Sequence, residues 1–285
     1  MKTSLSHLPQ TKQEQILQIV EIIKEVASPE KVILFGSYAT GKYVADSYLE
    51  NVTRFEYVSD FDFLIVTKVN DEKEFILKDK IVNRTRNLFK TPVNPIIHSL
   101  EYVNEGLEIG QYFFSEIIND GILLYEINSI SFSQPRLLSF EEKKEIAKGY
   151  FDQWFNSGKA LLNSVMFNFK EQEYNLAAFE LHQASERFYN TVLLVFTNYK
   201  PKTHNLDILR QYSKNLSIQL FLIFPYPIED EFETHLFDLL KRSYIEARYK
   251  NDFKITKKEL RLLINRVTKM KKIVKEICIK KISSF

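Results

Sequence analysis

The sequence predicts two parts: an α+β domain with a mixed sheet, followed by an all-α helical bundle. Three observations support this prediction. Before residue 128, short apolar runs typical of strands alternate with amphipathic segments, and after residue 140 only helical periodicity remains. Between them, residues 129–136 are rich in Ser and contain one Pro, which is typical of a connection. We therefore place the domains at 1–128 and 140–285, joined by a linker at 129–139.

The first domain begins with a predicted helix, because Ile16, Ile19 and Ile23 have helical spacing. Pro95 lies inside one predicted strand and indicates an edge strand or an irregularity, because proline cannot donate to a neighbouring strand. The predicted elements are, in order, a helix at 11–25, a strand at 31–35, a turn at 36–37 leading into a short helix that ends near Gly41, a strand at 61–67, a helix at 72–88, a strand at 93–98, a helix at 112–119 and a strand at 121–125.

The second domain is predicted to be a helical bundle. Its last predicted helix, at 256–279, has an apolar stripe, which we expect to lie in the core. The predicted helices are 141–166, 174–198, 206–212, 231–249 and 256–279.

Composition sets the broad class of the protein. The chain has 285 residues, of which 45% are apolar and 27% charged, as in globular proteins. It lacks an apolar run long enough for a membrane span and an N-terminal secretory signal. Cys278 is the single cysteine, so no internal disulfide can form. We expect a cytoplasmic protein without a membrane partner.

Charge is distributed unevenly along the chain. Residues 1–128 contain 13 Lys and Arg against 19 Asp and Glu, a net charge of −6, whereas residues 129–285 contain 26 against 18, a net charge of +8. Residues 254–281 alone contain 11 basic and 2 acidic side chains. Such a basic helix favours contact with RNA, or with the acidic first domain.

Four residues of the first domain point to nucleotide chemistry. Gly36 and Ser37 follow an apolar strand, and a glycine turn with free backbone N–H groups binds phosphate oxygens well. Asp60 and Asp62 stand at positions i and i+2, so both carboxylates project from one face of a strand. Mg²⁺ is commonly held by carboxylates together with substrate phosphates. A solvated turn is the alternative for each pair taken alone.

These two segments, residues 35–41 and 59–66, resemble the signature motifs of the minimal nucleotidyltransferases of the DNA polymerase β superfamily, which includes antitoxin-type members and kanamycin nucleotidyltransferase. The resemblance implies that Gly36 and Ser37 contact the triphosphate and that Asp60 and Asp62 are the catalytic ligands of Mg²⁺ or Mn²⁺. It also implies transfer of a nucleotidyl group, often AMP, from ATP or another nucleoside triphosphate. The acceptor stays open among protein, RNA and small molecules.

The chain departs from that family in three places. Between Ser37 and Asp60 lie 22 residues, so an inserted excursion is expected at 43–57. Position 40 is Thr where many relatives have a basic residue, and Lys42 is the candidate substitute for phosphate binding. The third carboxylate of active relatives is missing from the strand at 93–98, which offers only Asn94 and His98. His98 is therefore a candidate metal ligand, and a hydrogen-bonded structural histidine is the alternative.

Three segments of the second half, residues 177–189, 200–206 and 239–249, resemble the HEPN domain. Many HEPN domains are ribonucleases that need an Arg followed by a His after four to six residues, and no His in this chain has an Arg at that distance before it. Other HEPN domains, such as that of sacsin, bind nucleotides. Homodimerisation through the helical half is a further implication of the resemblance. The candidate anion-binding residues are Arg187, Lys202, His204, Arg242 and Arg248.

The leading hypothesis is therefore a Mg²⁺-dependent nucleotidyltransferase fused to a HEPN domain that does not cleave RNA. A catalytically silent nucleotide-binding regulatory module of toxin-antitoxin type is the alternative. A HEPN ribonuclease is the third hypothesis, and the missing Arg and His pair argues against it.

Overall fold

The computed structural model describes residues 1–43, 45–50, 53–68, 73–127, 131–225 and 231–285. The chain divides into two compact units, Met1–Leu137 and Leu138–Phe285, which are described separately here. The division between the units falls within the range predicted as the linker.

The first unit is built on a four-stranded sheet with the order β5-β4-β1-β6. β1 is antiparallel to both of its neighbours, while β4 and β5 run parallel, so the predicted mixed sheet is confirmed. Pro95 lies on β5, which is an edge strand as expected from its missing N–H. The strands are β1 (Lys31–Phe35), β4 (Phe61–Thr67), β5 (Val93–Ser99) and β6 (Ile122–Glu126).

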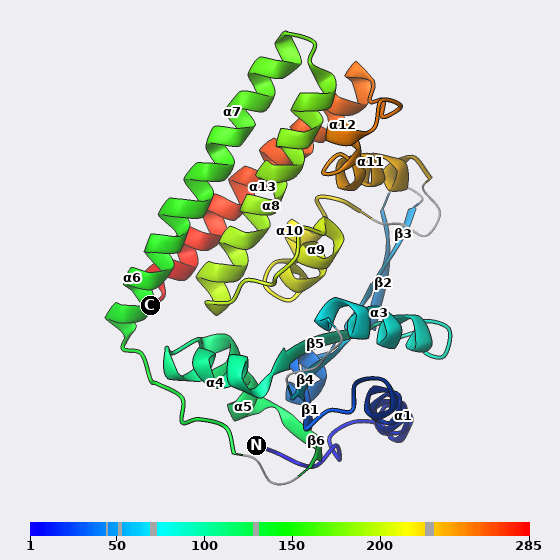
Figure 1. Ribbon diagram of the computed structural model, residues 1–285, viewed down its shortest axis with the longest axis vertical. Helices are drawn as coiled ribbons and strands as arrows, with labels where there is room; N and C mark the ends of the chain where they lie inside the picture. The colour runs from blue at the N-terminus through cyan, green and yellow to red at the C-terminus, as the bar shows by residue number, and fades with distance from the viewer. Residues whose placement is uncertain (44, 51–52, 69–72, 128–130, 226–230) are drawn as a thin grey trace. The chain divides into compact units, whose positions relative to one another are not determined.

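Helices cover both faces of this sheet (Figure 1). α1 (Gln10–Ala27) and α3 (Glu74–Thr85) pack on one face, where alternate strand residues form an apolar core with them. α4 (Leu100–Glu108) and α5 (Tyr112–Asp120) cover the other face. Asp62 belongs to this second face, because successive strand residues point to opposite sides and its neighbours Phe61 and Phe63 lie in the first core.

The segment between β1 and β4 contains a short helix and a hairpin. α2 (Gly36–Thr40) begins directly after β1 and ends at Gly41, which has a left-handed φ of 75°. β2 (Ala45–Glu50) and β3 (Thr53–Val58) then pair with each other as an antiparallel ribbon. The ribbon occupies the range predicted as an inserted excursion, and it returns the chain to β4 next to β1.

Long helices form the second unit, as predicted (Figure 1). α8 packs against α7, α13 and the shorter helices, so it is the centre of the bundle. A π-helical turn, η1, connects α6 and α7. The elements are α6 (Phe140–Tyr150), η1 (Phe151–Phe155), α7 (Asn156–Lys170), α8 (Tyr174–Thr197), α9 (Leu206–Lys214), α10 (Ile218–Phe221), α11 (Glu231–Arg242), α12 (Glu246–Tyr249) and α13 (Lys257–Ser283).

The helix predicted at 231–249 is interrupted, and this prediction was wrong in detail. α11 ends at Arg242 and α12 begins at Glu246. The buried hydroxyl of Ser243 lies 3.0 Å from the carbonyl oxygen of Ala178 on α8 and 2.7 Å from that of Leu240. These tertiary contacts favour a turn at this point, and the turn positions the side chain of Tyr244.

Candidate functional site

The Gly36 turn and Asp62 lie directly against each other. Phe35, the last residue of β1, pairs with Asp62 on the antiparallel strand β4, so the turn that follows β1 begins beside the first residues of β4. Gly36 has a φ of 74°, and a Cβ atom placed on it would lie 2.5 Å from Oδ2 of Asp62. Only glycine allows both this backbone conformation and this close approach. The structure therefore brings together the two motifs that the sequence separates by 22 residues.

Both aspartates of the pair are buried. Asp60 is 7% exposed and Asp62 is 4% exposed. Tyr38 of α2 lies near Asp60: burial raises the pKa of Tyr38, and the Asp60 carboxylate raises it further. An ionised carboxylate in such a position costs several kcal/mol unless positive charge or hydrogen bonds compensate for it. The surroundings of Asp62 show how the chain provides part of this compensation.

Asp62 is held by an amide and lies near an ammonium group. The side chain of Asn94, its partner in the parallel β4–β5 register, donates a hydrogen bond of 2.8 Å from Nδ2 to Oδ1 of Asp62. Lys78 of α3 donates in turn to Oδ1 of Asn94 over 3.4 Å. Burial lowers the pKa of Lys78 to about 8, while the Asp62 carboxylate acts in the opposite direction. The site thus combines Asp62, a neutral amide and one cation.

His98 does not join this group, contrary to the expectation that it could complete a metal site. It pairs with Val66 in the β4–β5 register, four residues along the strand from Asn94, a distance of about 13 Å. Its ring packs on Tyr102, with 4.4 Å between centroids, and its Nδ1 lies 3.4 Å from Oε1 of Glu74. These contacts agree with the alternative of a structural histidine at the strand end.

The remaining predicted residues of this site lie on α2 and just after it. The hydroxyl oxygen of Ser37 is buried and has no hydrogen-bond partner among the described residues. Lys42 lies beyond the C-terminus of α2, where its backbone N–H donates to the carbonyl oxygen of Ser37 over 2.9 Å and its side chain is exposed. Within the described ranges, no three His, Cys, Asp or Glu side chains form a group that could hold a metal ion. Asp60 and Asp62 therefore offer a metal ion two carboxylate ligands.

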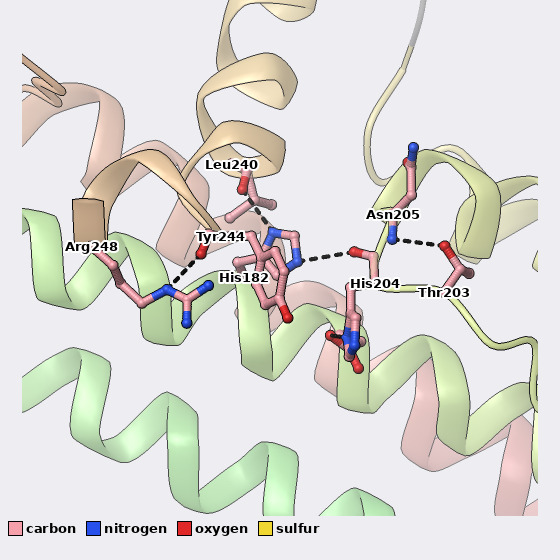
Figure 2. Close-up of polar contacts among 8 residues, drawn as sticks. His182, Thr203, His204, Asn205, Leu240, Tyr244 and Arg248 are labelled. Carbon is pink, nitrogen blue, oxygen red and sulfur yellow. Dashed lines mark hydrogen bonds and ion pairs between the residues drawn. The ribbon is translucent and has the colours of Figure 1, made fainter. Parts of the chain in front are cut away.

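The second unit contains a cluster of rings and charged groups around Tyr244, which we call the Tyr244 cluster (Figure 2). The ring of Tyr244 stacks on His182 and on His204, with 5.0 Å between centroids in each case. The Arg248 guanidinium lies 4.7 Å from the centre of the Tyr244 ring and 4.6 Å from that of Phe179. The Nε atom of Arg248 donates to the carbonyl oxygen of Tyr244 over 2.7 Å, which fixes the side chain.

His182 is the buried member of the Tyr244 cluster. Its Nδ1 lies 3.0 Å from the carbonyl oxygen of Leu240, and its Nε2 lies 3.1 Å from that of His204. A neutral imidazole has one N–H, so it can donate to only one of these carbonyls at a time. Burial lowers the pKa of His182, whereas the carbonyl contacts and Glu186 oppose that shift. His182 therefore links the last turn of α11 and the segment before α9 to the central helix α8.

His204 and Arg248 are exposed, and the structure brings them together. Nδ1 of His204 lies 3.0 Å from Oε2 of Glu186, which is buried. His204 and Arg248 lie 44 positions apart in the sequence, so no spacing rule for Arg and His could detect them. The cluster presents one guanidinium and one imidazole to solvent, both backed by aromatic rings.

The other predicted anion-binding residues make different contacts. Arg187 lies over the ring of Trp154, 4.5 Å from its centre. Arg242 forms an ion pair with Glu246, with 3.0 Å between Nη1 and Oε2. Lys202 is exposed in the segment before α9, two residues from His204. Of the five candidates, His204 and Arg248 contact the Tyr244 ring.

Residues that sequence reasoning missed are Lys78 near Asp62, and Phe179, His182, Glu186 and Tyr244 in the Tyr244 cluster. Lys78 lies on an amphipathic helix that also carries Lys80, so the sequence gives no signal that singles it out. Phe179, His182 and Glu186 follow a spacing of three and four residues, which places them on one face of α8. That spacing was a usable signal, although an apolar core face gives the same pattern.

The basic face of α13 is exposed. Its apolar stripe is buried as predicted, including Leu260, Val267 and Val274. The capping box of Thr256 and Glu259 fixes the start of the helix. The exposed basic side chains on α13 are Lys257, Lys258, Arg261, Lys269, Lys272, Lys275 and Lys280.

Comparisons with known proteins identify one part of the chain. No curated protein matches the sequence. Among the helices that the structure describes, none has the length and apolar character that a membrane crossing requires. Residues 151–277, which run from η1 to the last turns of α13, match the family model of the HEPN domain. The helical second unit of this chain therefore carries a HEPN domain.

Proposed function

We propose that the first unit is a nucleotidyltransferase, which transfers a nucleotidyl group, AMP in the simplest case, from ATP or another nucleoside triphosphate to an acceptor. The observation that carries this proposal is the contact between Gly36 and Asp62. A glycine turn of the kind that accepts phosphate lies directly against a buried carboxylate of the kind that binds Mg²⁺.

The residues present fit one divalent cation held together with a nucleotide. Asp60 and Asp62 provide hard oxygen ligands, and Mg²⁺ sites in nucleotide-dependent enzymes commonly use one or two carboxylates with the substrate phosphates. The buried hydroxyl of Ser37 has no partner among the described residues, so it is free to donate to a phosphate oxygen. Mg²⁺ or Mn²⁺, when bound, would neutralise phosphate charge and hold the leaving pyrophosphate.

The chain's own groups would position the reactants. In the transfer step, a hydroxyl oxygen of the acceptor forms a bond to the α-phosphorus, and the bond from that phosphorus to the bridging oxygen breaks. Pyrophosphate leaves, and the hydroxyl proton passes to solvent. The Gly36 turn would orient the triphosphate, and Asn94 fixes the orientation of the Asp62 carboxylate.

Calorimetry with Mg²⁺ and a non-hydrolysable ATP analogue tests nucleotide binding, and transfer of label from α-labelled ATP tests the reaction. Candidate acceptors are the chain itself, RNA and small hydroxyl compounds. Asp60→Asn and Asp62→Asn keep the size of each side chain while removing its charge, and both should abolish binding and transfer. Wild-type behaviour in both variants would overturn the proposal.

A silent nucleotide-binding module is the second candidate for this unit. The specific observation in its favour is that the neutral Asn94 faces Asp62 at the position where β5 lies beside the acid pair. This candidate predicts tight binding of the analogue by the wild-type protein and no transfer to any acceptor. Transfer that depends on Asp60 and Asp62 would exclude it.

For the HEPN domain, we propose anion or nucleotide binding at the Tyr244 cluster without RNA cleavage. The exposed guanidinium of Arg248 lies over the rings of Phe179, Tyr244 and Tyr249. His204 stacks on the same Tyr244 ring, and these groups suit a phosphate and a base. The basic face of α13 is the proposed RNA contact beyond this cluster, and homodimerisation through the helical unit is proposed from the family resemblance alone.

Fluorescence anisotropy with a labelled single-stranded RNA tests the binding proposal. Arg248→Ala should weaken binding about tenfold or more, because it removes a charge-assisted contact and a stacking partner. Arg187→Ala is the matched control, since this arginine also covers an aromatic ring but lies outside the Tyr244 cluster. Equal weakening by both variants would contradict a site at Tyr244, and cleavage of the RNA in EDTA that requires Arg248 would establish a ribonuclease instead.

A further inference from the structure

Lys78 lies near Asp62, where the proposed nucleotide site would need further positive charge to balance its carboxylates and the phosphates. The carboxylate of Asp62, the amide of Asn94 and the ammonium of Lys78 form a chain of contacts, with 2.8 Å between the first pair of atoms and 3.4 Å between the second. Each of the three residues comes from a different element: β4, β5 and α3. The ammonium is therefore positioned by tertiary packing and by a specific polar partner.

The packing of α3 fixes the backbone of this lysine. Leu77 and Ile81, on the same helix, are 3% and 0% exposed and belong to the core beneath the sheet. Lys78 follows Leu77 directly, so its stem leaves the helix at the edge of that core, and the side chain is half-buried. With a pKa of about 8, the amine is mainly protonated at neutral pH.

The chemistry of these groups allows one divalent cation and disfavours a second. Two divalent cations a few ångströms apart repel each other and need negative ligands to offset that repulsion, and the described residues contain no group of three His, Cys, Asp or Glu side chains that could hold a metal ion. The Asn94 amide carries no charge and already donates to Asp62. An ammonium near the same carboxylate repels a further cation while adding positive charge of its own.

We infer that Lys78 is a fixed positive charge that takes the place of a second divalent cation in the Asp60 and Asp62 site. This inference rests on the proposed nucleotide site and states how that site is charged. Lys78 is a positioning residue, because it acts through Asn94 and Asp62. The site then binds one metal ion with its nucleotide.

The test counts Mn²⁺ ions by electron paramagnetic resonance, using the full chain with a non-hydrolysable ATP analogue. We expect one Mn²⁺ per wild-type chain. The double variant Asn94→Asp/Lys78→Met supplies a third carboxylate and removes the ammonium, so it should bind two. Lys80→Met is the control on the same helix and should bind one, because this exposed lysine lies two positions further along. Two ions in the wild-type protein, or one in a folded double variant, would overturn the inference.

A second measurement uses Mn²⁺ alone and does not depend on nucleotide binding. Lys78→Met should raise the Mn²⁺ affinity of the protein about tenfold because a neighbouring positive charge is lost, whereas Lys78→Arg should leave it near the wild-type value. An unchanged affinity in Lys78→Met would count against the fixed charge. Failure of the wild-type chain to bind the analogue with any metal would instead overturn the proposed function, so the two failures are distinguishable.

Discussion

The two units of this protein use charged groups in opposite ways. In the first unit, Asp60 and Asp62 are buried, and strand pairing fixes the neighbours of Asp62. In the HEPN domain, Arg248 and His204 are exposed and are held by aromatic rings and single hydrogen bonds. Buried charge requires a nearly unique backbone arrangement, because any unpaired group costs several kcal/mol. Exposed charged groups tolerate rearrangement of the residues around them, so the Tyr244 cluster depends on fewer residues of the fold.

The largest expected effect tests whether the two units act separately. Asp62→Asn should reduce nucleotidyl transfer more than about 100-fold, because even outer-shell groups of metal sites change activity by about 10- to 100-fold. It should leave RNA binding at the Tyr244 cluster unchanged. Arg248→Ala should show the reverse pattern. Label transfer and RNA anisotropy on the same preparations measure both, and a variant that lowers both properties would show that the two sites are coupled.

The next effect isolates the contact between Gly36 and Asp62. Gly36→Ala introduces strain at a φ of 74° and places a Cβ atom 2.5 Å from Oδ2 of Asp62. Gly41→Ala has nearly the same φ, 75°, but its new Cβ would lie 3.6 Å from His7, which is ordinary contact. Gly41→Ala should cost about 1–2 kcal/mol of stability from backbone strain, and Gly36→Ala about 1–3 kcal/mol more.

Thermal unfolding together with hydrogen exchange in β1 and β4 measures this difference. Removing the carboxylate in Gly36→Ala/Asp62→Ala should recover most of the additional cost, because the clash is then absent. Equal destabilisation by the two single glycine variants would show that Gly36 and Asp62 are not in close contact.

A comparable glycine pair tests the packing of the HEPN domain. At Gly158 of α7, a Cβ atom would lie 2.8 Å from Cε1 of Phe188, inside the core. At Gly149 of α6, no atom lies within 4 Å of the added Cβ. Gly158→Ala should therefore destabilise the unit by about 1–3 kcal/mol, whereas Gly149→Ala should stabilise it by about 0.5–1 kcal/mol through helix propensity. Hydrogen exchange in α8 measures both, and the same sign for both would contradict the described packing.

The smallest expected effect concerns pH. Burial lowers the pKa of His182 below its ordinary value of 6.5, so below about pH 6.5 the unfolded chain binds this proton more readily than the folded chain. The stability of the HEPN domain should therefore fall as the pH drops through this range and should not change through His182 above it. Denaturant unfolding between pH 5 and 8 checks the slope. His182→Gln should have a flatter slope, and parallel curves for the two proteins would show that His182 does not titrate differently on folding.

Most elements of the first unit could be predicted from the sequence because their residues follow local rules of periodicity and turn formation. The strand predicted at 31–35 matches β1, and the one at 61–67 matches β4, since both are continuous apolar runs between turn signals. Pro95 correctly indicated an edge strand. The helix α4 was missed, although Ser99 caps its N-terminus by accepting a hydrogen bond from the backbone N–H of Tyr102. One capping residue after a strand was too weak a signal.

Side-chain partners were harder to predict than elements. His98 was considered with the acid pair because it stands on the strand next to them, but the parallel register places it about 13 Å along that strand from Asn94. In the HEPN domain, the turn at Ser243 depends on a carbonyl of α8, so no local pattern around residue 243 predicts it. Both errors concern contacts between segments that are distant in the sequence.

The sequence by itself determined most of the strands and helices in their order, the glycine turn and the pair of aspartates, because these depend on periodicity and on the conformations that single residues allow. Tertiary structure alone decided that Gly36 lies against Asp62, and that Asn94 donates to Asp62 and Lys78 to Asn94. It also decided that His204 and Arg248 both contact Tyr244. The physical reason is that strand register and helix packing set these distances, and both are fixed by the burial of apolar residues spread over the whole unit.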